Sequence, residues 1–418
     1  MSLHSPSHAG DQAGATLAAF VAAAELPHLS QQLQRLQRTP QVLQAGGPEQ
    51  AAQWCAAHGA PATLLVDISG HAYPQQALAD LASLCGPTTH IVLTGERQDV
   101  DLYRKLLQGG AFDYLLKPLD MHLLADTLAR AAEGLPLNLA GQSRSGRTVA
   151  IVGAAGGAGV STVVAALGQR LAGACQTPTV LVDLDRSKGD LPLLLGMEAD
   201  SGLSAMLALP EIDARLLQRT LRGAELADSA PPRLQLLAQR PEAPTPVDPE
   251  RVLQLGAALS QLFSVALWDL PAHRPDGARE VLEHADIRII LTELNLQHAR
   301  HVHRLLADIG DESGGQQLLL VHNNVRPAQR SAISLAQFEE FVGRKIDLQL
   351  PCAGNQLIDS LVDGALEVPA GSPFSSALAV LADRILGRRS AVAAPSLLAR
   401  LLALGGQRTL VNARSEPA

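Results

Sequence analysis

Short apolar segments alternate with helical segments along most of the chain, and this alternation restricts the fold more than any other feature of the sequence. In the first third of the chain, the apolar runs of strand length are 16–21, 41–44, 63–68, 90–94 and 113–116. Helical patterns such as 48–58 and 74–84 lie between them. Strands that alternate with helices at this spacing are typical of βαβ units, in which the strands form a parallel sheet.

The alternation restarts after residues 135–146, where Gly, Ser and Asn replace the periodic pattern and predict a linker. The later strands are expected at 148–153, 179–183, 235–237, 264–269, 287–291, 317–322 and 346–350, and the final helix at 375–386. We therefore expect two α/β domains, each a doubly wound parallel sheet. The predicted organisation is a flexible leader at 1–13, a first domain at 14–134, the linker at 135–146, a second domain at 147–389 and a tail at 390–418.

Composition narrows the functional classes. Of the 418 residues, 47% are hydrophobic and 18% are charged, which is a balance typical of globular domains. The formal net charge of −8 argues against a chain-wide electrostatic grip on nucleic acid. No apolar run reaches the roughly 18 residues of a membrane span, so we expect a cytoplasmic protein. Any motif that requires a lysine can be checked directly, because the only lysines are Lys105, Lys117, Lys188 and Lys345.

Three polar residues end strands of the first domain: Asp67, Thr94 and Lys117. The carboxyl ends of parallel strands line one crevice, so an acid, a hydroxyl and a cation are expected to meet there. With the stretch GGAFDYLLKP at 109–118, this pattern resembles the receiver domain of response regulators. The resemblance implies that Asp67 is the phospho-acceptor, Thr94 the switch hydroxyl and Lys117 the signature lysine.

One element of the receiver pattern is incomplete. Receivers carry two adjacent acids after the first strand, and these bind the Mg²⁺ that phosphoryl transfer to a carboxylate needs. Here that stretch reads Ala22, Ala23, Ala24 and Glu25, so at best one acid is present, and in an unexpected position. Two interpretations follow: a receiver fold kept for dimerisation or docking, or a live phosphorylation pocket.

A glycine-rich turn follows the first strand of the second domain. It joins the strand at 148–153 to a helix at 163–171 and reads AAGGAGVST over 154–162. Such a turn presents backbone N–H groups and a helix N-terminus to an anion. The residues expected to hold a nucleotide phosphate are Gly156, Gly157, Ala158, Gly159, Val160, Ser161 and Thr162, with the Ser161 hydroxyl also able to reach Mg²⁺.

Two further strands end in carboxylates beside this loop. One ends in Asp183 and continues to Asp185, and the other ends in Asp269. Carboxylates at these strand ends are placed to support a nucleotide-bound Mg²⁺ and to position or deprotonate a water. The sequence therefore predicts ATP and Mg²⁺ as cofactors.

At this point the second domain resembles the MinD/ParA family of deviant Walker ATPases, whose loop carries KGGxGKT. Both family lysines are missing, because their positions hold Ala155 and Val160. The resemblance implies that Asp185 activates water and that Asp269 is the Walker B acid, so these two are the expected catalytic residues. It also implies that Ser161, Asp183 and Asp269 serve the metal and that Asn323 and Pro351 lie at the base.

Loss of the lysines is expected to weaken binding and to slow hydrolysis more strongly. A P-loop lysine makes charge-assisted contacts with the β- and γ-phosphates and stabilises charge in the transition state. Binding through backbone N–H groups survives that loss. Arg186 and Lys188 follow Asp185 directly, and they either substitute for the missing cations or lie in a solvated loop.

An incomplete receiver ahead of a lysine-poor MinD-like domain resembles the TadZ/CpaE family of Flp (tight adherence) pilus assembly proteins. The stretch 333–387 is similar to that family across its whole length. The resemblance implies a homodimeric, ATP-binding localisation and assembly factor with weak or no hydrolysis, working with pilus secretion components at the cell pole or the inner face of the membrane. Two alternatives are a cycling MinD/ParA-like ATPase switch and a phosphorelay regulator with an ATPase-like output.

Two other features are weighed for function. His298, His301 and His303 lie on one predicted helix, where we expect solvated side chains rather than metal ligands, since a third ligand on their face is lacking. The segment 396–404 of the tail is leucine-rich and amphipathic. It is expected either to pack on protein or to anchor the chain to a membrane.

Overall fold

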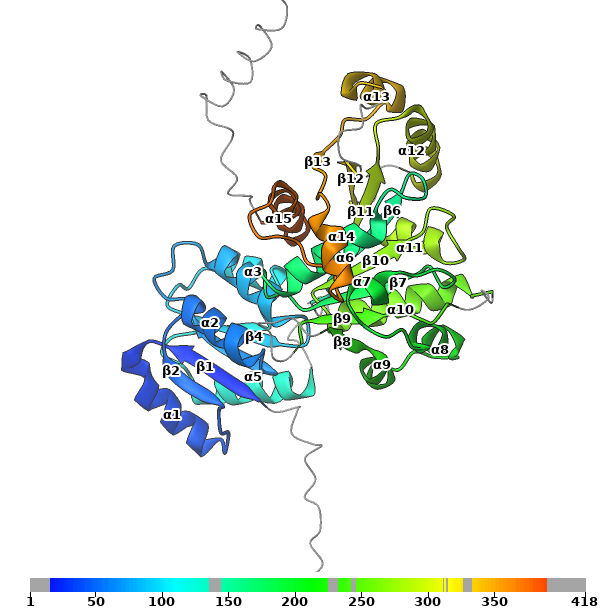
Figure 1. The fold of residues 1–418 in the computed structure, drawn as a ribbon. Coiled ribbons are helices and arrows are strands. Elements are labelled where there is room, and N and C mark those ends of the chain that lie inside the picture. Colours follow the sequence, from blue (N-terminus) through cyan, green and yellow to red (C-terminus); the bar gives the residue numbers. More distant parts are fainter. Residues whose placement is uncertain are drawn as a thin grey trace, which may run out of the picture.

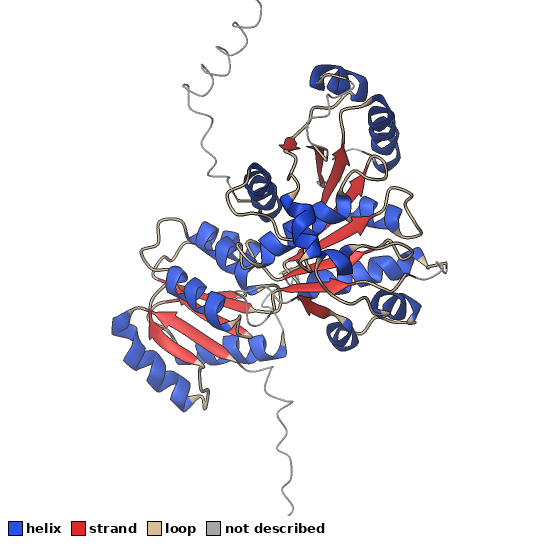
Figure 2. Ribbon diagram, in the orientation of Figure 1, coloured by secondary structure: helices blue, strands red, loops and turns tan. Residues whose placement is uncertain are grey.

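A computed structural model describes residues 16–134, 144–224, 232–241, 246–310, 312, 315–325 and 333–388. These residues form two α/β units, each with helices on both faces of a central sheet (Figures 1 and 2). The predicted leader, most of the predicted linker and the tail lie outside the described residues, and so does the amphipathic segment at 396–404.

The first unit has a five-stranded parallel sheet with strand order β2-β1-β3-β4-β5. This order is the doubly wound arrangement of flavodoxin-like folds. Its elements are β1 (Leu17–Val21), a 3-10 turn η1 (Ala23–Glu25), α1 (Leu26–Arg35), β2 (Val42–Ala45), α2 (Pro48–His58), β3 (Thr63–Asp67), α3 (Pro74–Cys85), β4 (His90–Gly95), α4 (Val100–Gln108), β5 (Asp113–Leu116) and α5 (Met121–Glu133).

The second unit has an eight-stranded sheet with order β13-β12-β11-β6-β10-β7-β9-β8. Its strands are β6 (Arg147–Gly153), β7 (Thr179–Asp183), β8 (Arg222–Ala224), β9 (Leu234–Leu237), β10 (Val265–Leu270), β11 (Ile287–Thr292), β12 (Gln317–Asn323) and β13 (Leu348–Leu350). Its helices are α6 (Val160–Ala172), α7 (Leu191–Leu194), α8 (Gly202–Ala208), α9 (Ala214–Thr220), α10 (Pro249–Leu262), α11 (Ala278–His284), α12 (Leu296–Ile309), α13 (Leu335–Val342), α14 (Gln356–Val362) and α15 (Pro373–Leu386).

The sequence analysis predicts α/β units with parallel sheets, and the structure confirms this fold class with one correction. Strand β8 was not predicted, and it pairs with β9 in the antiparallel direction. It is only three residues long and lies at the sheet edge, and two of its residues are exposed. A strand of this kind leaves no run of apolar residues in the sequence.

Aliphatic side chains on both faces of each sheet form the cores. Strands such as β3, β7 and β10 are buried at every position, which is the pattern of parallel strands covered by helices on both faces. Because these buried strands are fixed in the sheet, the polar residues at their ends lie at the carboxyl edge of each sheet. None of the described helices is long and apolar enough to cross a membrane.

Candidate functional site

The turn between β6 and α6, here called the phosphate cradle, is open to solvent at Gly156 and Gly157. Gly157 and Gly159 have φ angles of 81° and 79°, a left-handed conformation that favours glycine. Gly159 is the N-cap of α6, so the N–H groups of the first helical turn face outward. A Cβ placed on Gly156 or Gly157 would meet no atom within 4 Å. The turn therefore offers backbone donors, and nothing covers its two exposed glycines.

The two positions of the missing lysines supply no cation. Val160 begins α6 and packs against the hydrophobic core of the unit. Its Cγ2 atom would lie 3.1 Å from a Cβ built on Gly153, so the side chain packs close to the end of β6. Ala155 is half-buried and has only a methyl group to offer. A phosphate at this loop would therefore be held by backbone N–H groups.

Asp183 and Asp269 lie side by side at the ends of β7 and β10. They are paired residues in the strand register, and only 2% and 3% of their surface is exposed. Asp183 accepts hydrogen bonds of 3.1 Å from the N–H groups of Asp185 and Leu191, so it also holds the loop that follows β7. Two carboxylates are thus buried within one small volume beside the cradle.

This crowding of acids changes their proton affinity. Burial raises the pKa of Asp269 to about 7; the hydrogen bond from the Ser161 hydroxyl lowers it, and the charges of Asp185 and Asp190 raise it further. Burial, followed by the charge of Asp269, raises the pKa of Asp183 well above its usual value. Negative charge on these two acids is therefore disfavoured at this edge of the sheet.

Such a site fits Mg²⁺, which binds through one or two carboxylates and otherwise keeps water or phosphate ligands. The Ser161 hydroxyl and the Asp269 carboxylate already lie within hydrogen-bond reach of each other, with Asp183 beside them. No cluster of three or more His, Cys, Asp or Glu side chains with metal-ligand spacing occurs in the described part of the chain. The residues therefore suit a metal that arrives with a phosphate, rather than one held by protein ligands alone.

The predicted water-activating residue, Asp185, is engaged by its own loop. Its Oδ1 atom accepts hydrogen bonds from the N–H and hydroxyl of Ser187 at 3.2 and 3.0 Å and from the N–H of Lys188 at 2.9 Å. Lys188 is exposed, whereas Arg186 is 7% exposed and accepts a bond from Gln239 through its carbonyl oxygen. Asp190, which sequence reasoning missed, adds a fourth acid near this edge.

The residues expected at the base lie on the other side of the cradle. Asn323 at the end of β12 is buried, and its Nδ2 atom donates a 2.8 Å hydrogen bond to the carbonyl of Ala158. Pro351 directly follows Leu350, which pairs with Asn323 in the sheet. Asn323 therefore fastens the phosphate loop itself in this structure, in addition to lying where the resemblance places a base-reading residue.

Two of the three α12 histidines correct the expectation of solvated side chains, whereas His303 is exposed as expected. His298 is buried and its Nδ1 atom accepts a hydrogen bond from the N–H of Glu293, and burial lowers its pKa. His301 is half-buried and its Nδ1 atom lies 2.9 Å from the carbonyl oxygen of Ala154, so Nδ1 must donate. The contact joins α12 to the phosphate loop. No sequence signal marks it, because a helix far along the chain supplies the residue.

The first unit assembles its own pocket. The Nζ atom of Lys117 lies 2.5 Å from Asp67 Oδ2 and 2.8 Å from Glu25 Oε1. The sequence analysis expected Glu25 in an unsuitable position. It nevertheless reaches the pocket, because the turn η1 after β1 carries it to the lysine. Thr94 is fully buried at the end of the neighbouring strand β4, and its hydroxyl has no hydrogen-bond partner among the described residues.

The lysine sets the charge state of this pocket. Burial raises the pKa of Asp67, but the hydrogen bonds and charge of Lys117 and the bonds from Ser69 outweigh it, so the pKa is lowered overall. The pKa of Lys117 is raised, because the hydrogen bonds and charges of Asp67 and Glu25 outweigh its burial. The pocket holds a lysine clamped between two carboxylates.

Comparisons with known proteins bear on the fold. No protein-family model matches the chain. The septum site-determining protein MinD of Synechocystis sp. is 29% identical over 182 residues, and the match spans 43% of this chain and 65% of that protein. The structure of a ParA family ATPase from Chlorobium tepidum has a TM-score of 0.50 and 24% identity, covering 57% of this chain and 98% of its own. A CpaE2 pilus assembly protein from Sinorhizobium meliloti is 27% identical with a TM-score of 0.25, covering 28% of this chain and 98% of its own.

The second unit therefore has the fold of the MinD/ParA-type P-loop ATPases. Ahead of that fold the chain carries a receiver-like parallel sheet of five strands.

Proposed function

We propose that this chain is a nucleotide-binding localisation and assembly factor that binds ATP with Mg²⁺ and hydrolyses it slowly or not at all. The observation that carries the proposal is the composition of the phosphate cradle. It combines a backbone grip at Gly156–Thr162 and buried carboxylates at Asp183 and Asp269 with Ala155 and Val160 in place of both lysines.

Each residue of the cradle has a binding role under this proposal. The N–H groups of the α6 first turn hold the phosphates, and the Ser161 hydroxyl and Asp269 carboxylate hold the metal. The Mg²⁺ that arrives with ATP supplies positive charge beside the two carboxylates. Asp185 remains tied to Ser187 and Lys188, which limits its use as a base. Binding is thus favoured over turnover.

The pilus-assembly role is the finer part of the proposal. It is supported by the resemblance of the whole architecture, a receiver-like unit ahead of a lysine-poor MinD-like unit, to the TadZ/CpaE family. The partners then are pilus secretion components, at the cell pole or on the inner face of the membrane. The receiver-like unit serves docking in this account.

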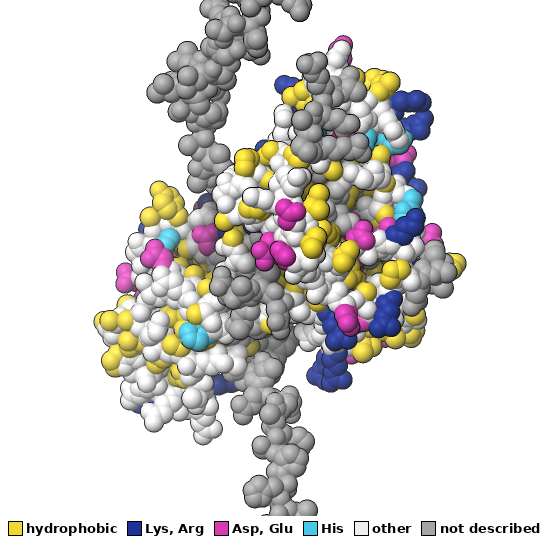
Figure 3. Space-filling view, viewed as in Figure 1, with side chains coloured by type: hydrophobic (Ala, Val, Ile, Leu, Met, Phe, Trp, Pro, Cys, Tyr) yellow, Lys and Arg dark blue, Asp and Glu magenta, His cyan; other side chains and the backbone are white. Residues whose placement is uncertain are grey.

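We also propose a homodimer formed by the face that carries α7 and α14. This face exposes Leu193, Ile358 and Val362, with 66%, 64% and 85% of their surface accessible. Figure 3 shows hydrophobic and acidic side chains intermixed over the α14 region. Exposed apolar groups of this size favour a protein contact. Sedimentation of the full chain should show a dimer that Val362→Asp weakens, whereas a wild-type monomer at micromolar concentration contradicts the dimer.

Turnover is tested on the full chain with Mg²⁺–ATP. We expect equilibrium binding, and hydrolysis far below that of a lysine-bearing P-loop ATPase, with little further change in Asp185→Ala. Rapid Mg²⁺-dependent hydrolysis that disappears in Asp185→Ala would instead establish the cycling ATPase switch.

A further inference from the structure

The two units are joined through the C-terminal end of α3. Here the carbonyl of Ser83 accepts a 3.3 Å bond from the Ser264 hydroxyl, and that of Leu84 accepts a 3.1 Å bond from Arg233. The carbonyl of Gly86 accepts a bond from Arg144. Helix C-termini leave carbonyls unpaired and carry partial negative charge, so arginines suit them. The second unit and the chain that leads into it therefore cap a helix of the first unit.

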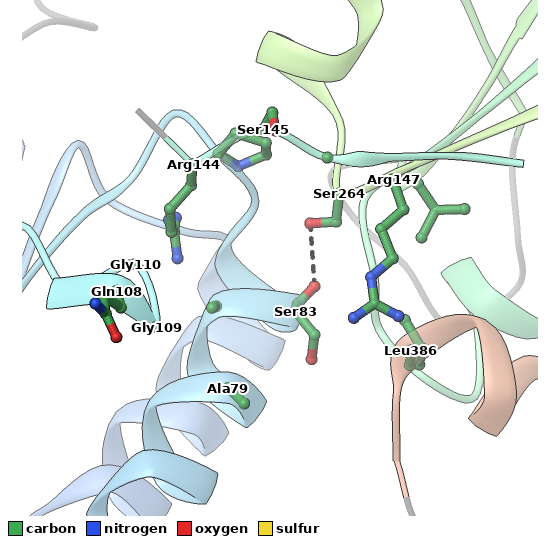
Figure 4. A pocket seen from close by; sticks show the side chains of 14 residues that line it. Ala79, Ser83, Gln108, Gly109, Gly110, Arg144, Ser145, Arg147, Ser264 and Leu386 are labelled. Atoms are coloured by element: carbon green, nitrogen blue, oxygen red, sulfur yellow. Dashed lines mark hydrogen bonds between the residues drawn. The ribbon is translucent and has the colours of Figure 1, made fainter. Parts of the chain in front are cut away.

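A cavity of about 320 Å³ lies at this seam. Its lining comes from α3, the turn after α4, residues 144–147, the start of β10 and the end of α15. Figure 4 shows Arg144 and Arg147 on either side of the hydrogen bond between Ser83 and Ser264. The cavity thus has walls from both units and two guanidinium groups within one short stretch of chain.

The positive charge here is poorly compensated. Arg144 has no ion-pair partner in the part of the chain that the structure describes, and its buried Nη1 atom has no hydrogen-bond partner there. Burial lowers its pKa. Arg147 donates to the carbonyl of Ile385 rather than to an acid. Arg388 binds the Ser83 hydroxyl at 2.9 Å, and its nearest carboxylate, Asp80, is 4.0 Å away and half exposed.

Arg144 is half-buried and Arg147 is exposed. A partly buried guanidinium without an anion leaves part of its desolvation cost uncompensated, which favours a site that an anion completes. Guanidinium groups match the oxygen geometry of phosphate, and their planar donors bind it more specifically than a point charge does. The Ser83 hydroxyl accepts a bond from Arg388 and donates to the carbonyl of Asp80 at 2.9 Å, so it holds Arg388 at the edge of the cavity. We propose that this cavity binds a small phosphate-bearing anion that bridges the two units. The volume suits inorganic phosphate or a group of nucleoside monophosphate size rather than a polymer.

Such a ligand stabilises the docked arrangement, since it contacts both units in the folded state only. The site is independent of the phosphate cradle at Gly156, and its test must separate the two. Gly156→Asp places a negative charge at the exposed cradle without a clash, because nothing lies within 4 Å of its Cβ position. That variant removes phosphate binding at the cradle and leaves the seam intact.

The seam is tested with a charge-matched pair. Ala79 is exposed, lines the cavity and lies one helical turn before Ser83 on the same face of α3. Ala79→Glu puts a competing carboxylate beside the arginines, whereas Ala79→Gln keeps the same shape without charge. Both leave the bonds of Arg144 to Gly86 and Thr89 in place.

Inorganic phosphate is titrated into the full chain by calorimetry at constant ionic strength. Wild type, Ala79→Gln and Gly156→Asp should bind phosphate at the seam with the same affinity, and Gly156→Asp should do so with one site fewer because its cradle is blocked. Ala79→Glu and Arg147→Gln should lose at least about tenfold in affinity at the seam. Phosphate should also raise the melting temperature of the first three proteins only. The proposal is overturned if Ala79→Glu binds like Ala79→Gln, if only Gly156→Asp loses binding, or if wild type binds no phosphate below about 10 mM.

Discussion

The receiver-like pocket and the phosphate cradle are built on the same plan, yet their charge balances are opposite. Both gather carboxylates at the carboxyl edge of a parallel sheet. In the first, Lys117 lies between Asp67 and Glu25, and the pKa of Asp67 is lowered. In the second, the pKa values of Asp183 and Asp269 are raised. A single buried cation therefore decides whether such a pocket holds its acids charged.

This difference separates what each pocket can do without a ligand. In the receiver-like pocket, the Asp67 carboxylate already has Lys117 as its ion-pair partner. The cradle has two buried acids and a set of backbone donors, so it gains most from a ligand that brings positive charge and phosphate together. We therefore propose ligand binding for the second unit and a structural contact for the first.

The largest expected effect comes from removing the lysine of the receiver-like pocket. Lys117→Met leaves Asp67 and Glu25 without their cation, which should cost about 3 kcal/mol of unfolding free energy at pH 7. The lowered pKa of Asp67 means that this stabilisation is present above the usual aspartate pKa and is lost as the pH falls. Urea unfolding at pH 7 and pH 3 measures both effects.

The control for that experiment is the double variant Asp67→Asn with Lys117→Met. It removes the uncompensated charge and should recover part of the lost stability. Equal stability of wild type and Lys117→Met at pH 7 would show that the ion pairs contribute nothing measurable.

In the cradle, we expect removal of a charged side chain to stabilise the protein rather than to destabilise it. Asp269→Asn should stabilise the protein at pH 8, because the wild-type carboxylate must ionise there in a site that favours its protonated form. The folded chain binds a proton at Asp269 that the unfolded chain has released, so wild-type stability falls as the pH rises from about 4 toward 7. Thermal unfolding without Mg²⁺ across this range should show that fall in wild type and a flatter profile in the variant.

An exposed acid, Asp308, provides the control for this dependence of stability on pH. Asp308→Asn removes a carboxylate that is 56% exposed and should leave the pH profile of wild type unchanged. Identical slopes for wild type and Asp269→Asn would contradict the account of the buried acids. Added Mg²⁺ should raise the melting temperature of wild type more than that of Asp269→Asn.

The smallest effect is expected from phosphodonors. The receiver-like unit should resist phosphorylation by acetyl phosphate, because only Glu25 is present where two acids are needed, and it is already paired with Lys117. Mass spectrometry of the treated chain should show no adduct. Stoichiometric, Mg²⁺-dependent phosphorylation that is lost in Asp67→Asn would make the phosphorelay interpretation correct.

The repeating elements could be predicted from the sequence because parallel strands are buried along their whole length. The expected strand 113–116 and the helix 48–58 agree with β5 and α2 residue for residue. The start of α6 was predicted three residues late, at 163 rather than at Val160, because the Gly-rich turn has no apolar period to mark its end. Element ends set by caps are harder to predict than element interiors.

Contacts made across the fold could not be predicted. Asp67 and Lys117 were expected together because both end strands, and the structure brings them together. Glu25 lies in a 3-10 turn and His301 on a helix, so neither belongs to a strand-end pattern. Their roles depend on how separate elements pack, which a single sequence does not encode in its periodicity.

The central claim, that the cradle grips phosphate through its backbone and lacks only cations, is tested most directly by restoring them. Mg²⁺–ATP binding by calorimetry should tighten about 10- to 100-fold when Ala155→Lys and Val160→Lys are combined, which is the scale of a charge-assisted hydrogen bond. Leu216→Lys, an added charge on the half-exposed face of α9, serves as the control and should bind like wild type. Equal affinity of the restored and wild-type chains, or tightening by Leu216→Lys to the same degree, would contradict the claim.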